Sequence, residues 1–254
     1  MASADDILDE LGLAPRWVLR TGTRSGTAAQ AAVRAPPVAV ARAGATPAGG
    51  GVARADAGSP HGDRAMRIAR MSLEELSADV ATCTACGLCR GRKHAVPGVG
   101  DARAEWLFIG EAPGAEEDLR GEPFVGQAGK LLDNMLAALG LSRERNVYIA
   151  NVLKCRPPNN RDPKPEEVRA CLPYLFRQIE LVDPQLILCV GRIAAQTLLE
   201  TDTTIGKLRG QLHRIAGNRP MIVTYHPAYL LRSLADKAKA WDDLLLARRA
   251  LAPG

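Results

Sequence analysis

The strongest constraint on the fold is the alternation of short apolar runs with helix-like segments after residue 100. Apolar runs predict strands at residues 106–109, 147–150, 186–190 and 221–224. Helical patterns follow these runs, at residues 127–139, 165–182, 192–200 and 236–251. Strands separated by helices require right-handed crossovers, which produce a parallel sheet covered on both faces. We therefore predict an α/β fold of three α/β/α layers around a mostly parallel four-stranded sheet.

The residues ahead of this pattern differ in composition and predict two further segments. Residues 1–20 contain a short amphipathic peptide, either a weakly helical tail or a docking peptide for a partner protein. Residues 21–60 contain no Leu, Ile, Met, Phe, Trp or Tyr, so they cannot bury enough apolar surface to offset their ordering entropy. We predict a disordered linker over 21–70 and a folded domain over 71–254, which opens with a capping box from Ser72 to Glu75.

Charge and hydropathy limit the partners and the compartment. The net charge of +5 and the pI near 9.0 lean weakly toward a polyanionic partner such as nucleic acid. The first ten residues are acidic and no apolar segment follows them, so we expect no secretory signal. No run of about 18 apolar residues predicts a membrane span. We expect a cytoplasmic protein, in which six cysteines are metal ligands or buried thiols rather than disulfides.

Polar residues follow three of the predicted strands. Glu111 comes just after the first strand, Asn151 after the second and His226 after the last. The carboxyl ends of parallel strands meet at one edge of a sheet, so these side chains should converge. The first of these strand ends opens the Gly- and Pro-rich stretch 110–126, which suits close approach to a ligand, although an acidic surface loop would have similar composition. A carboxylate, an amide and an imidazole around one cavity can read a polar ring and stabilise charge.

The cysteines form a second group of candidate ligands. Cys83, Cys86 and Cys89 have C-x2-C-x2-C spacing, but position 93 is Lys where the bacterial ferredoxin pattern would continue with cysteine. A fourth ligand must therefore come from Cys155 or Cys171, and Cys189, inside an apolar strand, is expected in the core. The spacing alone leaves an iron–sulfur cluster, zinc and scattered free thiols open.

Three ordered motifs add a family resemblance. GEAPGAEEDLRGEPFVG, NVLKCRPPNNRDPKPEEVRAC and HPAYLLR closely resemble the iron–sulfur (family 4) uracil-DNA glycosylases, over about residues 72–252. The resemblance implies a monomeric enzyme of base excision repair, which flips uracil out of DNA and hydrolyses its N-glycosidic bond to leave an abasic site. It also implies a [4Fe–4S] cluster on four cysteines, with Cys89 as an extra thiol. The four are Cys83, Cys86, Cys155 and Cys171.

The resemblance also implies roles for individual residues. Asn151 would pair with the uracil edge, and His226 would donate to the charge that develops on uracil O2. Glu111 would orient the attacking water, and backbone amides of the turn that begins at Gly110 would also face O2. Phe124 would stack on the flipped base.

Further residues are expected to recognise the base and the DNA. Glu117 stands where the family crowds the 5-methyl group of thymine. In the loop 227–232, Leu230 or Leu231 would fill the gap left by the flipped base. The candidate phosphate contacts are Lys207 and Arg209, followed by Lys154, Arg156 and Arg161.

Two alternatives remain at this point. An X-type glycosylase bonds covalently to uracil through a histidine in a basic insert, but the stretch 155–167 after Asn151 contains no histidine and no such insert. A non-catalytic iron–sulfur accessory protein of a DNA polymerase or replisome is the other alternative. The N-terminal peptide keeps it open as an added role, whereas the presence of Glu111, Asn151 and His226 together argues against it as the sole role.

Overall fold

The computed structural model of this chain describes residues 60–215 and 217–251. These residues belong to a compact unit that spans residues 51–254. The peptide predicted at residues 1–20, and the predicted linker as far as residue 59, lie outside the described residues.

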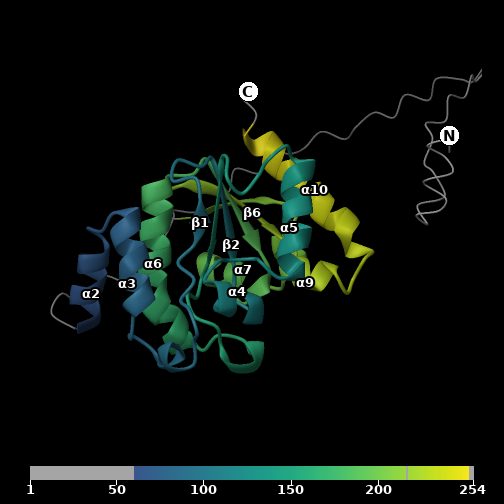
Figure 1. The fold of residues 1–254 in the computed structure, drawn as a ribbon. Helices are drawn as coiled ribbons and strands as arrows, with labels where there is room; N and C mark the ends of the chain where they lie inside the picture. Colours follow the sequence, from purple (N-terminus) through teal and green to yellow (C-terminus); the bar gives the residue numbers. More distant parts are fainter. Residues whose placement is uncertain (1–59, 216, 252–254) are drawn as a thin grey trace, which may run out of the picture. The chain divides into compact units, whose positions relative to one another are not determined.

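A six-stranded sheet forms the centre of the fold (Figure 1). In sequence its strands are β1 (Val99–Gly100), β2 (Trp106–Gly110), β3 (Val147–Asn151), β4 (Leu186–Val190), β5 (Leu212–Ile215) and β6 (Arg219–Thr224). Their spatial order is β1-β3-β2-β4-β6-β5, and the inner four are mutually parallel. The parallel four-stranded centre confirms the predicted fold class. The antiparallel edge strands β1 and β5 were not predicted, because β1 has two residues and β5 is largely exposed.

Helices cover both faces of the sheet (Figure 1). One face packs against α6 (Pro165–Val182), α7 (Arg192–Leu199) and α8 (Ile205–Leu208). The other packs against α5 (Gln127–Ala138), α9 (Pro227–Leu230) and α10 (Asp236–Leu251). The remaining helices are α2 (Pro60–Ile68), α3 (Leu73–Thr82), α4 (Ala115–Arg120) and the 3₁₀ turns η1 (Gly87–Arg90) and η2 (Pro158–Asn160). Within the described residues, none of the helices is long and apolar enough to span a membrane.

The inner strands read as continuous apolar runs because both of their faces are buried. Every residue of β2, β3 and β4 is buried. Alternate side chains enter opposite layers: Leu107 and Ile109 of β2 join the α6 side, whereas Trp106 and Phe108 join the α5 side. This arrangement fixes the strand ends, and with them the residues that follow each strand.

Helix α2 lies within the stretch that the sequence analysis assigns to the linker. Ile68 is fully buried with Leu76, Val80 and Tyr174, so a single apolar residue anchors α2 against α3 and α6. The described fold thus begins at residue 60 rather than at 71. Ser72 and Glu75 form the expected capping box.

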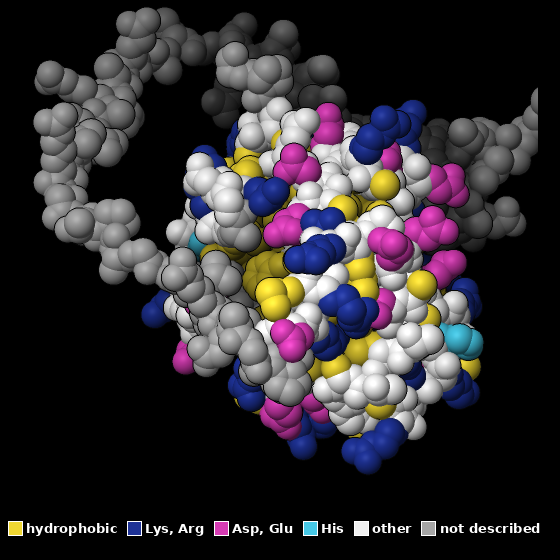
Figure 2. Space-filling view, turned by 90° about the vertical axis from the view of Figure 1, so that its left-hand side faces the viewer, with side chains coloured by type: hydrophobic (Ala, Val, Ile, Leu, Met, Phe, Trp, Pro, Cys, Tyr) yellow, Lys and Arg dark blue, Asp and Glu magenta, His cyan; other side chains and the backbone are white. Residues whose placement is uncertain are grey.

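Basic and acidic side chains are interspersed on the face of the molecule that Figure 2 shows. They are not collected there in the basic stripe that typifies a nucleic-acid-binding face.

Candidate active site

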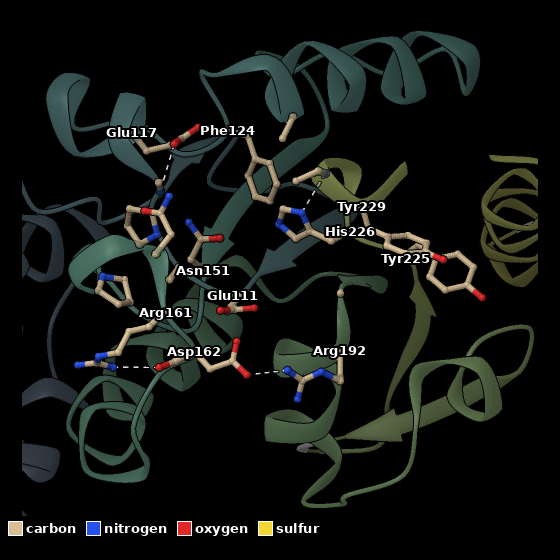
Figure 3. Close-up of a pocket in the computed structure, with 18 of the residues that line it drawn as sticks. Glu111, Glu117, Phe124, Asn151, Arg161, Asp162, Arg192, Tyr225, His226 and Tyr229 are labelled. Carbon is tan, nitrogen blue, oxygen red and sulfur yellow. Dashed lines mark hydrogen bonds and ion pairs between the residues drawn. The ribbon is translucent and has the colours of Figure 1, made fainter. Parts of the chain in front are cut away.

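A cavity of about 780 Å³ opens at the carboxyl ends of the parallel strands (Figure 3). Glu111 follows β2, Asn151 ends β3 and His226 follows β6, and all three line this cavity. The structure therefore brings together the three side chains expected to converge. Gly191 and Arg192, which follow β4, complete this edge.

Asn151 is the most deeply placed polar group in the cavity wall. Asn151 is 2% exposed, and its side-chain Oδ1 has no hydrogen-bond partner among the described residues. A buried acceptor without a partner costs about 1–3 kcal/mol, so such groups point to a missing ligand. Gly110 beside it must be glycine, because an added Cβ would lie 2.4 Å from Asn151 Oδ1 and 2.6 Å from Phe124 Cζ.

His226 is fixed as one neutral tautomer. It caps α9, and its Nδ1 accepts a hydrogen bond from the Ala228 backbone N–H at 3.1 Å. Burial lowers the pKa of His226 to about 4, with a smaller opposing effect from Glu117. At neutral pH the ring is therefore uncharged and carries its proton on Nε2, which makes it a hydrogen-bond donor at the cavity wall.

Glu111 carries a carboxyl group that titrates near neutrality. Burial raises its pKa from 4.5 to about 7, and the neighbouring Asp162 acts in the same direction. Arg192 opposes the shift and is itself paired with Asp162 at 2.7 Å. Half-buried carboxyls with a pKa near neutrality are suited to proton transfer and water activation.

Phe124 forms an aromatic wall of the cavity. Its ring is stacked on that of His226, with 5.5 Å between centroids and 28° between planes. Its φ of 55° is unfavourable for a bulky residue, and such strain is retained mainly at functional sites. Arg143 secures the loop by donating to the carbonyls of Pro123 and Phe124, and Gly129 lets α5 approach the Phe124 carbonyl.

Glu117 ties the two ends of the loop 111–126 together. One carboxylate oxygen accepts from the backbone N–H groups of Val125 and Gly126, at 2.9 and 3.0 Å. The other accepts from the Gly114 N–H at 3.1 Å. The acidic stretch is thus an ordered cavity wall rather than a solvated surface loop.

The structure distinguishes the two leucines of the predicted wedge loop. Leu230 is 1% exposed and packs into the core beside α5 and α10, so it cannot enter DNA, contrary to expectation. Leu231 is 43% exposed. Leu234, which the sequence analysis did not select, is 65% exposed just beyond it.

The residues expected to contact phosphate also differ in their exposure and in their partners within the protein. Lys207 is exposed, as a phosphate contact requires. Arg209 instead forms an ion pair with the buried carboxylate of Asp243 at 2.8 Å. Lys154 is fully buried and donates to the Asn151 carbonyl at 2.8 Å and to Gln178 at 2.6 Å, so it cannot reach a phosphate in solvent.

Two contributors to the site escaped the sequence analysis. Asp162 raises the pKa of Glu111, but it lies 51 positions further along the chain, and nothing in its local sequence indicates this neighbour. Arg143 follows α5 and is far in sequence from the carbonyls it holds. A surface arginine of this kind has no spacing or motif that would indicate its partner.

The cysteines line a second, much smaller cavity. Cys83, Cys86, Cys89, Cys155 and Cys171 all face it. Two of these sulfurs accept hydrogen bonds from arginine side chains, Cys83 from Arg64 at 3.6 Å and Cys155 from Arg92 at 3.2 Å. Cys189 is fully buried in the core.

In the described part of the chain, no three His, Cys, Asp or Glu side chains gather closely enough to hold a single metal ion. The five cysteines nevertheless face one small cavity. Burial raises the pKa of Cys171 to about 12, and burial also raises the pKa of Cys155 and of Cys86. These thiols therefore need bound metal to ionise.

Comparisons with known proteins agree with this geometry. The model of the uracil DNA glycosylase superfamily matches residues 97–245, more than half of the chain. A type-4 uracil-DNA glycosylase of Archaeoglobus fulgidus is 50% identical over 167 residues, which cover 63% of this chain and 83% of that protein. Those of Sulfurisphaera tokodaii and Saccharolobus solfataricus are 46% and 44% identical, covering 63% and 71% of this chain and 76% and 87% of those proteins. The chain thus belongs to the uracil-DNA glycosylase superfamily.

Proposed function

We propose that this chain flips uracil out of DNA and hydrolyses its N-glycosidic bond, leaving an abasic site. The observation that carries the proposal is the buried Asn151 Oδ1 without a partner, at the wall of a cavity that also holds His226 and Glu111. A base inside a duplex is shielded by stacking, so it must leave the helix before such a cavity can receive it.

Asn151 supplies the pairing that selects the base. Its Oδ1 accepts the N3–H of uracil, while its amide N–H donates to O4. Cytosine presents the opposite pattern at these positions and would leave buried groups unpaired, at about 1–3 kcal/mol each. The buried position of Asn151 makes this discrimination effective, because no water can substitute for the missing partner.

His226 stabilises the leaving group. As the glycosidic bond breaks, negative charge develops on uracil O2, and the Nε2–H of the neutral imidazole donates to it. The Ala228 N–H holds the ring in this tautomer before substrate arrives. A preorganised donor of this kind contributes about 3–4 kcal/mol to the transition state. Backbone amides of the turn that begins at Gly110 add to the same effect.

Glu111 acts on the other side of the breaking bond. Its ionised carboxylate orients the attacking water, accepts the water proton and stabilises the cationic, oxocarbenium-like sugar. The pKa of about 7 means that a substantial fraction is ionised at neutral pH.

Phe124 and Glu117 shape the base slot. The Phe124 ring offers a stacking surface to the flipped base, held by the strained and clamped loop. Glu117 crowds the 5-methyl of thymine. Its three backbone hydrogen bonds support this role, because they prevent the carboxylate from swinging aside for a larger base.

Exposed residues near the cavity contact the DNA. Leu231 fills the space that the flipped base leaves, and Leu234 flanks it. Lys207 contacts a phosphate, as an exposed cation can. We propose that the enzyme is a monomer in the cytoplasm, with the N-terminal peptide available to a protein partner; the position of all the named site residues in one chain supports the monomer.

We propose that Cys83, Cys86, Cys155 and Cys171 hold a [4Fe–4S] cluster. The N–H···S hydrogen bonds from Arg64 to Cys83 and from Arg92 to Cys155 support this choice, and Cys86 and Cys171 face the same cavity. The guanidinium groups of Arg64 and Arg92, each bonded to one of these sulfurs, suit a cluster with four negative thiolates. When bound, the cluster supplies a covalent tie between the segment 83–86 and the segment 155–171, and the chemistry at uracil falls to the cavity residues.

The test is incubation of the purified full chain with a uracil-containing oligonucleotide, followed by alkali cleavage at abasic sites. We expect cleavage at uracil and none with matched thymine or cytosine oligonucleotides. A double variant, His226→Ala with Asn151→Ala, serves as the control for contaminating glycosylase. Absence of abasic sites with the wild-type chain would contradict the proposal, and full activity of the double variant would refute the site assignment.

A further inference from the structure

Helix α2 packs against two helices that position the proposed cluster ligands Cys83 and Cys171. It lies ahead of the region matched by the superfamily model, and it packs against both α3, which ends just before Cys83, and α6, which carries Cys171. Two arginines one turn apart on α2 make these connections. Arg64 faces the cysteine cavity, whereas Arg67 pairs with Asp79 of α3 on the outside.

Arg64 makes three separate contacts at the edge of the cysteine cavity. Nη1 donates to the carbonyl of Ala170, the residue before Cys171, at 2.9 Å. Nη2 donates to Cys83 Sγ at 3.6 Å. The guanidinium also lies 4.7 Å above the centroid of the Tyr174 ring, within the range of a cation–π interaction. Its position is therefore determined from three directions rather than by one flexible ion pair.

From this geometry we infer that Arg64 of α2 is a positioning residue for the iron–sulfur cluster, which closes its cavity and tunes its electron density. The inference rests on the proposed cluster at the cysteines. An N–H···S bond withdraws charge from a ligating thiolate, and a fixed cation stabilises the more negative, reduced state, so both effects raise the reduction potential. The same side chain covers Cys83 and blocks small reagents from reaching that ligand.

The structure offers a matched control on the same helix. Arg64→Met keeps an unbranched stem that can rest on Tyr174, but it removes the donor to Cys83 and the positive charge. Arg67→Ala removes the double hydrogen bond to Asp79, at 2.5 and 3.1 Å, without touching a sulfur. Both variants loosen α2, and only the first alters the cluster surroundings.

The experiment uses the full chain with its cluster and measures two properties of the cluster itself. One is the rate at which the iron–sulfur absorption bleaches with ferricyanide and EDTA, and the other is the reduction potential from direct electrochemistry. We expect Arg64→Met to bleach about tenfold faster than wild type and to have a more negative potential. Arg67→Ala should stay within about twofold of the wild-type rate, with an unchanged potential.

The outcomes separate this inference from the proposed cofactor. Iron and acid-labile sulfide are measured first, and their absence from the wild-type chain would refute the cluster, and the inference with it. With the cluster present, equal bleaching rates and potentials for Arg64→Met and wild type would overturn the role of Arg64 alone. Equal effects of both variants would also overturn it, because they would show that α2 merely stabilises the fold.

Discussion

The two cavities of this molecule use buried polar groups in opposite ways. The strand-end cavity holds an acceptor on Asn151 without a partner, a carboxyl of raised pKa on Glu111 and a histidine of lowered pKa. The cysteine cavity is small, and Cys83 and Cys155 in it already accept N–H donors from Arg64 and Arg92. A substrate site leaves polar groups unsatisfied until the substrate binds, whereas a resident cofactor site is complete around its occupant.

Lys154 connects the two cavities. Lys154 lines the cysteine cavity, and its Nζ donates to the carbonyl of Asn151, a residue of the substrate cavity, at 2.8 Å. Changes in the cysteine cavity should therefore reach the substrate cavity through the fold. Changes in the substrate cavity should leave the cofactor intact, and this asymmetry can be tested.

The largest effect should come from removing one proposed ligand. Cys171→Ser should lose the iron and reduce the free energy of unfolding by on the order of 4 kcal/mol or more, because metal binding is coupled to folding. Cys89→Ser, at the same cavity, should keep the iron and change stability by less than about 0.5 kcal/mol. Iron analysis and urea denaturation measure both. Iron loss in Cys89→Ser with retention in Cys171→Ser would reverse the ligand assignment.

A change in the substrate cavity should affect chemistry and spare the cofactor. His226→Ala should lower kcat by about 10²–10³-fold, the usual loss when one preorganised donor to a developing oxyanion is removed. Its iron content and absorption spectrum should match those of wild type. Single-turnover excision from a uracil oligonucleotide measures the rate, with His94→Ala, an exposed histidine outside the cavity, as control. A drop of less than about fivefold would refute the proposed role of His226.

The pH dependence should report Glu111, and the Glu111→Gln variant separates its contribution from that of Lys154, whose pKa burial also brings to about 7. The carboxylate must be ionised to act, so kcat/KM should rise about tenfold per pH unit below pH 7 and level off above it. His226, with a pKa of about 4, remains neutral across this range and should add no falling limb. Glu111→Gln should remove the rise and leave a slow, flat profile. A plateau that extends down to about pH 5 in wild type would show that Glu111 is not the titrating group.

Sequence reasoning succeeded where local pattern and backbone topology decide the outcome. The apolar runs predicted all four parallel strands, and the polar residues after them converged because the carboxyl ends of parallel strands share one edge. The helix boundaries at Ser72 and Pro165 followed from capping and proline rules. The motifs that carried the family resemblance lie on these same strand ends.

It failed where contacts formed in the folded chain determine the position of a side chain or a helix. Lys154 has the composition of a phosphate contact, but Gln178 and the Asn151 carbonyl hold it in the interior. Arg209 is committed to Asp243, 34 residues further on. Helix α2 formed within the predicted linker because Ile68 found a buried site against α3 and α6. Composition cannot show such pairings, since each depends on tertiary contact.

The smallest expected effect is a gain in stability that accompanies loss of function. Folding raises the pKa of Glu111 from 4.5 to about 7. Between pH 4.5 and about 7, the Glu111 carboxyl is therefore more protonated in the native state than in the unfolded chain. The wild type therefore loses stability as pH rises from about 4.5 to 7 and keeps that deficit at higher pH. Glu111→Gln carries no charge there and should unfold with a free energy about 1 kcal/mol higher at pH 8, a value reduced for partial solvent screening. The gain should shrink toward pH 5. Thermal denaturation at both pH values measures it, with Glu116→Gln on the exposed loop surface as control. Equal stabilities at pH 8 would show that the Glu111 carboxylate is well solvated and so is not prepared for catalysis by burial.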